Sequence, residues 1–587
     1  MRFNKTYTPK GIRPYPAVSN VQEKRSLVLG SRQSTAPATA LFLLLGLMLT
    51  GCSSNPLDSL NPFKPEEDEG QRGTIGFVQG FFGGVATDEP MAAVIGREIL
   101  SAGGTAADGA VAVSLALSLT LPSSAGLGGG GVCVINDAVK ERRETLDFLP
   151  GTPGVIPPGS QQVTAVPGLL RGLAELHSRY GRLKWRQLVS PAEKLTRFGN
   201  QISRAYAADV KQITQSMLAD PGFLRFLISK EKNRLIREGD FIKQLALSSV
   251  LSRIRSQGVG DFYTGLLSRQ LVAAVKEVGG SLSRKDLRDY TPHWRPTLRV
   301  PYVKTTTFHF PNVPGGSGVV LAQMLGMLIE HGDWDDAEPA ERLHLLSEIS
   351  ARAYGAYWRN LGQGSHGKDP EKLISKDAID ELYVGFQEDR HTALSAPAGI
   401  LPPPPPKPVP GTSFIIVDRE GSAVICSLTM NGLFGAARVA GGMGIVLAKS
   451  APAPGTDPGG PAVMMLVNEI QNTFYFGAGA SGGIAPAVSL AGLGANTIMG
   501  RDEEDLVTAL STRRVFNSGF PDTTYYERGL DKTLVQDLTR RGHLLSPAAS
   551  LGLVNAVFCP AGIPHKKNLS CSVRNDPRGF GLFYSAE

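Results

Sequence analysis

The stretch "KPVPGTSFIIVD", residues 407–418, comes directly after five consecutive prolines and turns into an apolar run within a few residues. A proline tract is stiff, hydrated and unable to join a sheet, so we expect it to be exposed. The run from Phe414 to Val417 is typical of a buried strand. Two interpretations are open: a linker that enters a sheet, or an exposed cut site whose new N-terminal residue acts as a nucleophile.

The sequence pattern differs on the two sides of this stretch. Helical patterns alternate with short strands from about residue 76 to 400, and residues 91–119 predict two helices joined by a turn at Gly103 and Gly104. After the linker come near-continuous apolar segments, which are typical of strands covered on both faces. Further helices are predicted at 482–495, 502–511 and 530–541. Strands between helix layers predict an α/β (α+β) fold, a four-layer αββα sandwich.

The positive net charge is confined to the N-terminal segment. The chain has 587 residues, 42% apolar and 19% charged, with a formal charge of +7. Residues 1–51 hold seven Lys or Arg and one Glu, so this segment carries six of the seven excess positive charges. The charge therefore gives no support to a nucleic-acid partner.

The same N-terminal segment has the pattern of a secretory signal. A basic region precedes the short apolar run "ATALFLLLGLMLTGC", which ends at Cys52 and is too short for a comfortable membrane span. The end of the run resembles a bacterial lipobox, so we expect 1–51 to be a lipoprotein signal and Cys52 the lipidated first residue; an uncleaved anchor or a plain signal is the alternative. Residues 52–75 read as a tether. We expect a lipoprotein held by its lipid anchor alone, facing the periplasm on the bacterial outer membrane.

Four cysteines remain after Cys52. Cys133 and Cys426 lie in apolar surroundings and are predicted to be buried thiols. Cys559 and Cys571 flank a loop, and we predict a disulfide between them in an oxidising periplasm. No Cys/His group has metal-ligand spacing, so neither a metal nor another cofactor is expected.

Four motifs follow one another along the chain: "GVATDEPMAAVIGREILSAGGTAADGAVAVSLALSLTLPSSAGLGGGG" (84–131), "VPGLLRGLAELHSRYGRLKW" (166–185), "VPGGSGVVLAQML" (313–325) and "NDPRGFG" (575–581). In this order they resemble the γ-glutamyltranspeptidase family of N-terminal-nucleophile hydrolases. The resemblance spans about residues 76–587. It implies a large-subunit-like part, 76–411, and a small-subunit-like part, 412–587, which form one αββα domain together and stay associated if the chain is cut.

In the family, the small subunit begins at a Thr that autocleavage frees, and "GTSFIIVDREGSAV" (411–424) is the counterpart here. A hydroxyl needs an adjacent base, and the α-amino group of an N-terminal residue, with a pKa near 8, can be that base. A gap-free alignment places Gly411 at the nucleophile position and Thr412 at the family's second Thr. Either the cut falls before Thr412, with a compensating bulge in the strand, or the protein is not an enzyme of this mechanism.

The resemblance also assigns supporting groups. "SLTMNGLFG" (427–435) places Thr429 as the hydroxyl that orients the nucleophile and Asn431 as a substrate contact. "GASGG" (479–483) places Gly482 and Gly483 as the backbone donors for the oxyanion, a role that exposed amide groups can fill. A tight turn before a helix is the alternative for the two glycines.

The family's glutamyl-binding groups are replaced in this sequence. Leu149 stands where the family has an Arg for the substrate carboxylate, and Lys449 and Ser450 stand where an acid is usual. Arg438 is a candidate replacement for the carboxylate contact, with a structural or surface Arg as the alternative. We expect a hydrolase or acyltransferase for a small γ-glutamyl substrate such as glutathione. An acylase for a less polar amide and a non-catalytic envelope protein are the alternatives.

Overall fold

The computed structural model describes residues 83–585 apart from 157–163, 230, 314–315, 333, 363–368, 396–405, 407–410, 451–459, 461, 501–504 and 565–570. The chain divides into two compact units, 1–70 and 71–587, and the description below concerns the second. The predicted signal, Cys52, the tether and most of the proline tract lie outside the described residues. None of the helices in the described ranges is long and apolar enough to cross a bilayer.

Two antiparallel sheets form the centre of the second unit. The first has seven strands in the order β22-β1-β11-β12-β2-β3-β8, with bounds Leu582–Ser585, Gly83–Thr87, Thr412–Asp418, Ala423–Thr429, Gly130–Asp137, Arg142–Phe148 and His293–Pro296. The second has six in the order β21-β20-β16-β15-β10-β9, with bounds Ser572–Asn575, Leu553–Ile563, Thr473–Ser481, Ala462–Asn468, Thr306–Phe310 and Leu298–Pro301.

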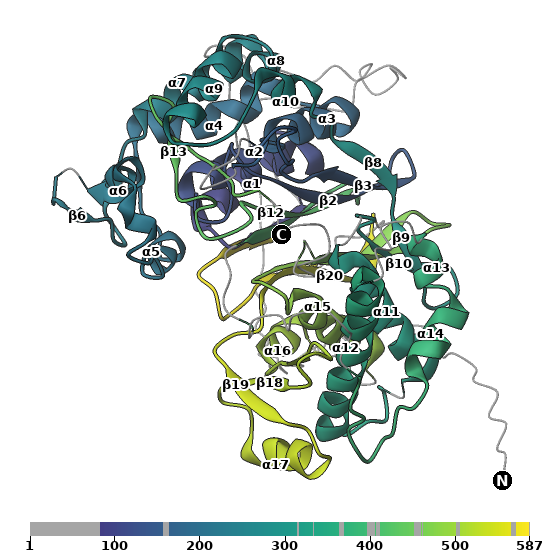
Figure 1. Cartoon of the computed structure of the whole chain (residues 1–587). Coiled ribbons are helices and arrows are strands. Elements are labelled where there is room, and N and C mark those ends of the chain that lie inside the picture. The colour runs from purple at the N-terminus through teal and green to yellow at the C-terminus, as the bar shows by residue number, and fades with distance from the viewer. Residues whose placement is uncertain are drawn as a thin grey trace, which may run out of the picture. The chain divides into compact units, whose positions relative to one another are not determined.

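Helices cover the outer face of each sheet (Figure 1). On the first sheet pack α1 (Pro90–Ser101), α2 (Ala106–Thr120) and α3 (Leu169–Tyr180), with α4 (Trp185–Phe198) and α7 (Leu245–Gln257) behind them. On the second sheet pack α11 (Ser317–His331) and α15 (Pro486–Gly494), and α12 (Pro339–Gly362) packs against both of these helices. Strands β11 and β12 contact β16 of the other sheet, so the predicted αββα sandwich is confirmed.

The remaining elements are short and lie outside the two central sheets. The helices are α5 (Arg204–Val210), α6 (Pro221–Leu227), α8 (Gly260–Tyr263), α9 (Leu266–Glu277), α10 (Arg284–Asp289), α13 (Pro370–Leu373), α14 (Lys376–Tyr383), α16 (Leu506–Ser511), α17 (Lys532–Arg540), a 3-10 turn at Met217–Ala219 and a π-helical turn at Ala495–Met499. The strands are β4 (Asn200–Gln201), β5 (Ile228–Ser229), β6 (Arg234–Leu235), β7 (Phe241–Ile242), β13 (Val439–Ala440), β14 (Ile445–Val446), β17 (Val515–Asn517), β18 (Thr524–Glu527) and β19 (Leu545–Ala548).

The local sequence explains the two N-terminal helices. Helix α1 ends before Gly103, and α2 begins after Thr105, whose hydroxyl accepts from the backbone of Asp108 while the Asp108 carboxylate accepts from the backbone of Thr105. This capping box stabilises the start of a helix. Every residue of α2 is buried, as expected for a helix that is apolar on all sides. The predicted pair of helices with a glycine turn is confirmed.

Strand β11 is buried along its whole length because both of its faces are covered. Phe414 and Ile416 face the helix layer, whereas Ile415 and Val417 face the second sheet. This alternation fixes the register of β11, because a slip of one residue would exchange the two sets of side chains.

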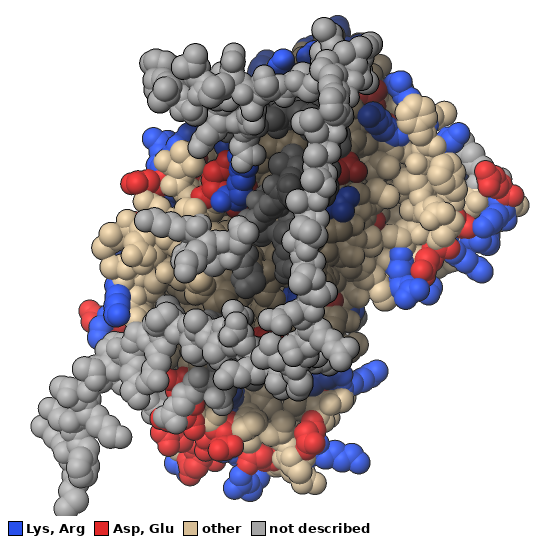
Figure 2. All heavy atoms as spheres, turned by 180° about the vertical axis from the view of Figure 1, so that it is seen from behind, with Lys and Arg blue, Asp and Glu red and all other residues tan. Residues whose placement is uncertain are grey.

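Charged side chains of both signs are mixed on the surface. Figure 2 shows Lys and Arg beside Asp and Glu over the described part of that face. The picture agrees with a charge balance that is close to neutral outside residues 1–51.

Both cysteine pairs form disulfides. Cys559 and Cys571 are bonded as predicted. The prediction that Cys133 and Cys426 are free thiols is wrong: they are bonded to each other, because β2 and β12 are neighbours and the two cysteines are direct cross-strand partners. Their separation of 293 residues hid this pairing in the sequence.

The two disulfides predict different losses of stability when they are removed. In the chain-entropy account, the longer closed loop constrains the unfolded chain more. In a Thr412→Ala background, in which the chain stays uncut, we expect the double substitution Cys133→Ala/Cys426→Ala to lower the free energy of unfolding by about 5 kcal/mol, and Cys559→Ala/Cys571→Ala by about 3 kcal/mol. Urea unfolding of the two variants beside the parent measures both values, and equal losses would contradict the expectation.

Candidate active site

The start of β11 carries a buried hydroxyl that contacts a carboxylate. Thr412 is 0% exposed, and its Oγ1 donates a hydrogen bond to Oδ2 of Asp88 at 2.9 Å. The backbone N–H of Ser413 donates to the same oxygen at 3.1 Å. The Ser413 hydroxyl donates instead to the carbonyl of Gly479 at 2.9 Å. Of the two hydroxyls, Thr412 is therefore the one that has a base within hydrogen-bond distance.

Asp88 lies between β1 and α1 and links the two sheets. Its Oδ1 accepts from Nδ2 of Asn555 on β20 at 2.8 Å, and Ser481 Oγ at the end of β16 lies 3.5 Å from Oδ2. Burial, the largest influence, raises the pKa of the Asp88 carboxyl, although hydrogen bonds from Asn555, Ser413 and Thr412 oppose the rise. Asp88 lies within the family motif at 84–131, but the sequence assigned it no role.

The pairing of β11 with β12 shows which residue faces the predicted supporting hydroxyl. Thr412 pairs with Leu428, and the ladder continues to Val417 and Ala423 without a shift in register. Continuing the ladder by one residue places Gly411 opposite Thr429, so these two positions share a face of the sheet. The bulge that would have moved Thr412 into that place is absent from the described pairing.

Gly411 has room for a side chain. A Cβ built there would lie 3.6 Å from the carbonyl oxygen of Leu428 and 3.7 Å from Cβ of Ser481, which are ordinary van der Waals distances. Gly411 does not have a positive φ, so its backbone conformation does not require glycine. The position that matches the family's nucleophile is thus unfilled beside the Ser481 end of β16.

The turn predicted to hold an oxyanion follows β16 directly. Gly482 and Gly483 have φ values of +116° and +85°, which favour glycine. Within the described part of the chain, neither amide N–H donates a hydrogen bond to another residue. Two amide donors therefore remain available beside Ser481, which is itself linked to Asp88.

Thr429 and Asn431 form a local turn. Oγ1 of Thr429 accepts from the backbone N–H of Asn431 at 2.9 Å, and Nδ2 of Asn431 donates to the carbonyl of Lys449 at 2.9 Å. Among the described residues, the Thr429 hydroxyl donates to no other group, and position 429 shares a face of the sheet with Gly411. Their predicted roles, orienting a nucleophile and contacting a substrate, stay predictions.

The γ-glutamyltranspeptidase family model matches residues 92–581. The chain belongs to the γ-glutamyltranspeptidase family. Relatives include a glutathione hydrolase proenzyme of Pseudomonas aeruginosa, 29% identical over 386 residues that are 62% of this chain and 67% of that protein. Glutathione hydrolase 2 of Arabidopsis thaliana is 29% identical over 393 residues, 63% of this chain and 65% of that protein. The matches thus span about two thirds of these relatives, which are enzymes.

A solved structure shares the fold. Cephalosporin acylase from Bacillus halodurans superposes with a TM-score of 0.72 at 21% identity, over 89% of this chain and 99% of that chain. The agreement over almost the whole acylase chain supports the αββα assignment of this γ-glutamyltranspeptidase-family protein.

The residues expected to bind a glutamyl group are arranged differently from the family's pattern. The guanidinium Nε of Arg438 lies 3.6 Å from Oδ2 of Asp220, so this candidate carboxylate contact has an acidic neighbour within the chain. Leu149 is half-buried, and its carbonyl accepts from the Tyr290 hydroxyl at 2.8 Å. Lys449 is exposed.

A histidine cluster away from Thr412 has the chemistry of metal ligands. Possible ligand atoms of His344, Glu348 and His543 lie within 4.8 Å of one another, and all three residues are buried. A hydrogen bond of 2.8 Å joins His344 Nδ1 and His543 Nε2, and Glu348 contacts both His391 and Arg352. This cluster was not predicted from the sequence, although the spacing of His344 and Glu348 on one helix was a usable signal.

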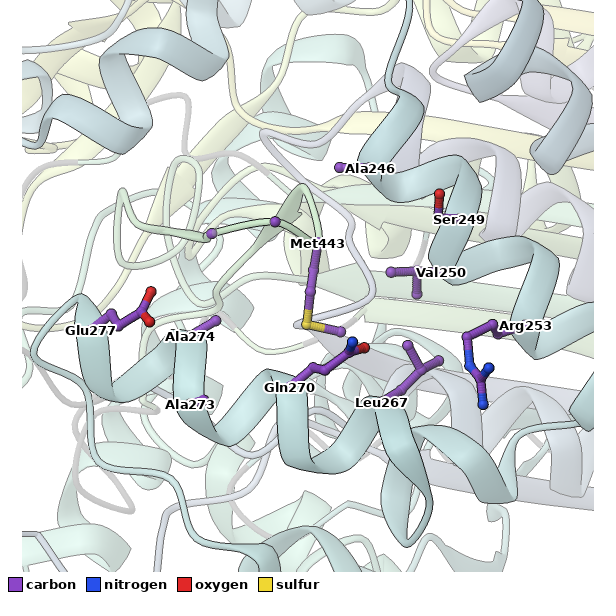
Figure 3. Close-up of a pocket in the computed structure, with 12 residues that line it drawn as sticks. Ala246, Ser249, Val250, Arg253, Leu267, Gln270, Ala273, Ala274, Glu277 and Met443 are labelled. Atoms are coloured by element: carbon purple, nitrogen blue, oxygen red, sulfur yellow. The ribbon is translucent and has the colours of Figure 1, made fainter.

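A separate cavity of about 370 Å³ lies between α7 and α9 (Figure 3). The turn at Gly441–Met443 closes one side, and the Met443 side chain extends between the two helices. The lining contains neither Thr412 nor the glycine turn, so the cavity is not part of the predicted site of this family member.

Because position 411 lacks a side chain, we expect that a hydroxyl introduced there would create a new self-cleavage site. We expect Gly411→Thr to fold, because its Cβ has room, and to make the chain cut itself on the N-terminal side of position 411. The new hydroxyl would lie on the face of Thr429, where the family's mechanism needs it. N-terminal sequencing of the purified variant detects the cut, and Gly411→Val, which has a similar shape without the hydroxyl, should not cut there. A folded but uncut Gly411→Thr chain would contradict the assignment of this position.

Proposed function

We propose that this chain is an amidohydrolase or acyltransferase that cuts itself between Gly411 and Thr412 and then uses Thr412 as its N-terminal nucleophile. The observation that supports it is the contact between Thr412 Oγ1 and the Asp88 carboxylate, which also lies next to Ser481 at the start of the glycine turn. A hydroxyl with a base and two amide donors with no partner among the described residues are the parts that acyl transfer needs.

The reaction follows from these groups. After the cut, the α-amino group of Thr412 takes the proton from its own hydroxyl, and Oγ1 attacks the amide carbonyl of the substrate. The N–H groups of Gly482 and Gly483 stabilise the negative charge that develops on the carbonyl oxygen. The amine leaves with a proton, and water or a second amine then takes the acyl group from Thr412.

The substrate class is inferred from the relatives and from the residues at which this chain differs from the family's glutamyl-binding pattern. Glutathione hydrolases at 29% identity point to γ-glutamyl amides. Leu149 and the pairing of Arg438 with Asp220 favour an acyl group with less charge than a glutamyl head group, because an unpaired buried carboxylate is costly. We include in the proposal the lipid anchor at Cys52 and a site that faces the periplasm.

The register of β11 favours a second candidate. Because Gly411 faces Thr429 without a bulge and Thr412 is fully buried, the chain is also suited to be a non-catalytic member that keeps the fold in the cell envelope. The two candidates differ in whether the chain is cut.

Self-cleavage predicts a fragment that starts Thr-Ser-Phe. It would contain 176 of the 587 residues of a 62.4 kDa chain, or about 19 kDa. We expect this band, identified by N-terminal sequencing, on a denaturing gel with a thiol reductant. The reductant is needed because Cys133 and Cys426 lie on opposite sides of the cut.

Thr412→Ala is the control for that experiment, and it should give a single band. A single band from the parent protein, purified under conditions in which relatives are active, would exclude the proposed mechanism and leave the non-catalytic candidate. If the parent is cut, comparing γ-glutamyl-p-nitroanilide with simple acyl anilides then identifies the acyl group.

A further inference from the structure

The carboxylate of Asp88 is held in one orientation against Thr412. Nδ2 of Asn555 donates to Oδ1, and the backbone N–H of Ser413 donates to Oδ2, so the two oxygens have different partners. The Thr412 hydroxyl donates to Oδ2 at 2.9 Å. This distance is within the range in which a carboxylate can take a proton from a hydroxyl.

A nucleophile at position 412 lies on the opposite face of the strand from one at position 411, so its base must lie on that opposite face. Side chains alternate across a sheet, so Thr412 does not share the face of Gly411 and Thr429. Thr429 is therefore not placed to orient the Thr412 hydroxyl. Asp88, from the loop after the neighbouring strand β1, is the group that contacts it.

From this arrangement we infer that Asp88 is the general base that activates Thr412 for cleavage of the bond between Gly411 and Thr412. The inference rests on the proposed function, because it assigns the residue that starts self-cleavage. Before the cut, Thr412 has no free amine, so the base of the later reaction does not yet exist. A separate group must take the first proton.

The step balances in protons and bonds. Oδ2 of Asp88 takes the proton of the Thr412 hydroxyl while Oγ1 attacks the carbonyl carbon of Gly411. The bond from that carbon to the Thr412 nitrogen breaks, and the protonated Asp88 returns the proton to the leaving nitrogen. The product is an ester between Gly411 and Thr412 Oγ1. Water hydrolyses it to the Gly411 carboxylate and the free Thr412 hydroxyl.

The electrostatic surroundings suit a base. No Lys or Arg within the described ranges forms an ion pair with Asp88, and its burial raises its pKa. A carboxylate with a raised pKa is a stronger base than a solvated one, and the hydrogen bonds from Asn555, Ser413 and Thr412 favour its charged form. The negative charge of Asp576 also raises the pKa of Asp88. Asp576 itself forms ion pairs with Arg514 and Arg578.

The test measures the rate of self-cleavage in Asp88 variants. A positioned general base contributes about 10²- to 10⁴-fold, so Asp88→Asn should cut at least 100-fold more slowly than the parent. Asp88→Ala should be equally slow, and added formate, a small carboxylate, should restore part of its rate. Glu89→Gln is the matched control, because Glu89 is the adjacent buried carboxylate and caps α1 instead of contacting Thr412. It should cut at the parental rate.

Thr412→Val distinguishes an effect on folding from an effect on the cleavage reaction, because it removes the same hydrogen bond while keeping the Asp88 carboxylate. Thermal unfolding of all variants identifies any that misfold, and formate should not restore cleavage in Thr412→Val. Rapid cleavage of folded Asp88→Asn, or no response of folded Asp88→Ala to formate, would overturn the role of Asp88 while the proposed function stands. A parent chain that is never cut would overturn both.

Discussion

The pairing of β11 with β12 determines the chemistry open to this chain. Apolar side chains cover both faces of β11, so its register cannot slip without exchanging the helix-facing and sheet-facing sets. That register places Gly411, and not Thr412, beside Thr429. A packing constraint at Phe414 to Val417 thus decides which hydroxyls can meet at the end of the strand.

The polar groups near this end of β11 meet at the Asp88 carboxylate. Asp88 collects donors from three strands, β11, β16 and β20, and so ties the two sheets together where their apolar core ends. A buried carboxylate without a cation is costly, and each of its hydrogen bonds lowers that cost. The same contacts that stabilise the junction of the sheets also align the carboxylate with the Thr412 hydroxyl.

Much of the fold could be predicted from the sequence, because it depends on patterns between near neighbours. The Gly103 turn and the apolar run of β11 are local signals, and the order of the motifs indicated the family. The pairing of Cys133 with Cys426 and the contact of Asp88 with Thr412 depend on strand order, which joins residues hundreds of positions apart. The histidine cluster could not be predicted in full for the same reason, since His543 meets His344 only through the packing of α12 against the C-terminal elements.

The disulfide between β2 and β12 determines whether a cut protein is one covalent molecule or two separate chains. Cys133 belongs to the large-subunit-like part and Cys426 to the small-subunit-like part, so a cut before Thr412 would leave one covalent molecule. Dilution could not separate the two parts, and the midpoint of unfolding would not depend on protein concentration, as it does for associating chains. With the bond reduced, the cut protein would become a true heterodimer, whose integrity depends on its concentration and on the apolar contacts between β11, β12 and their neighbours.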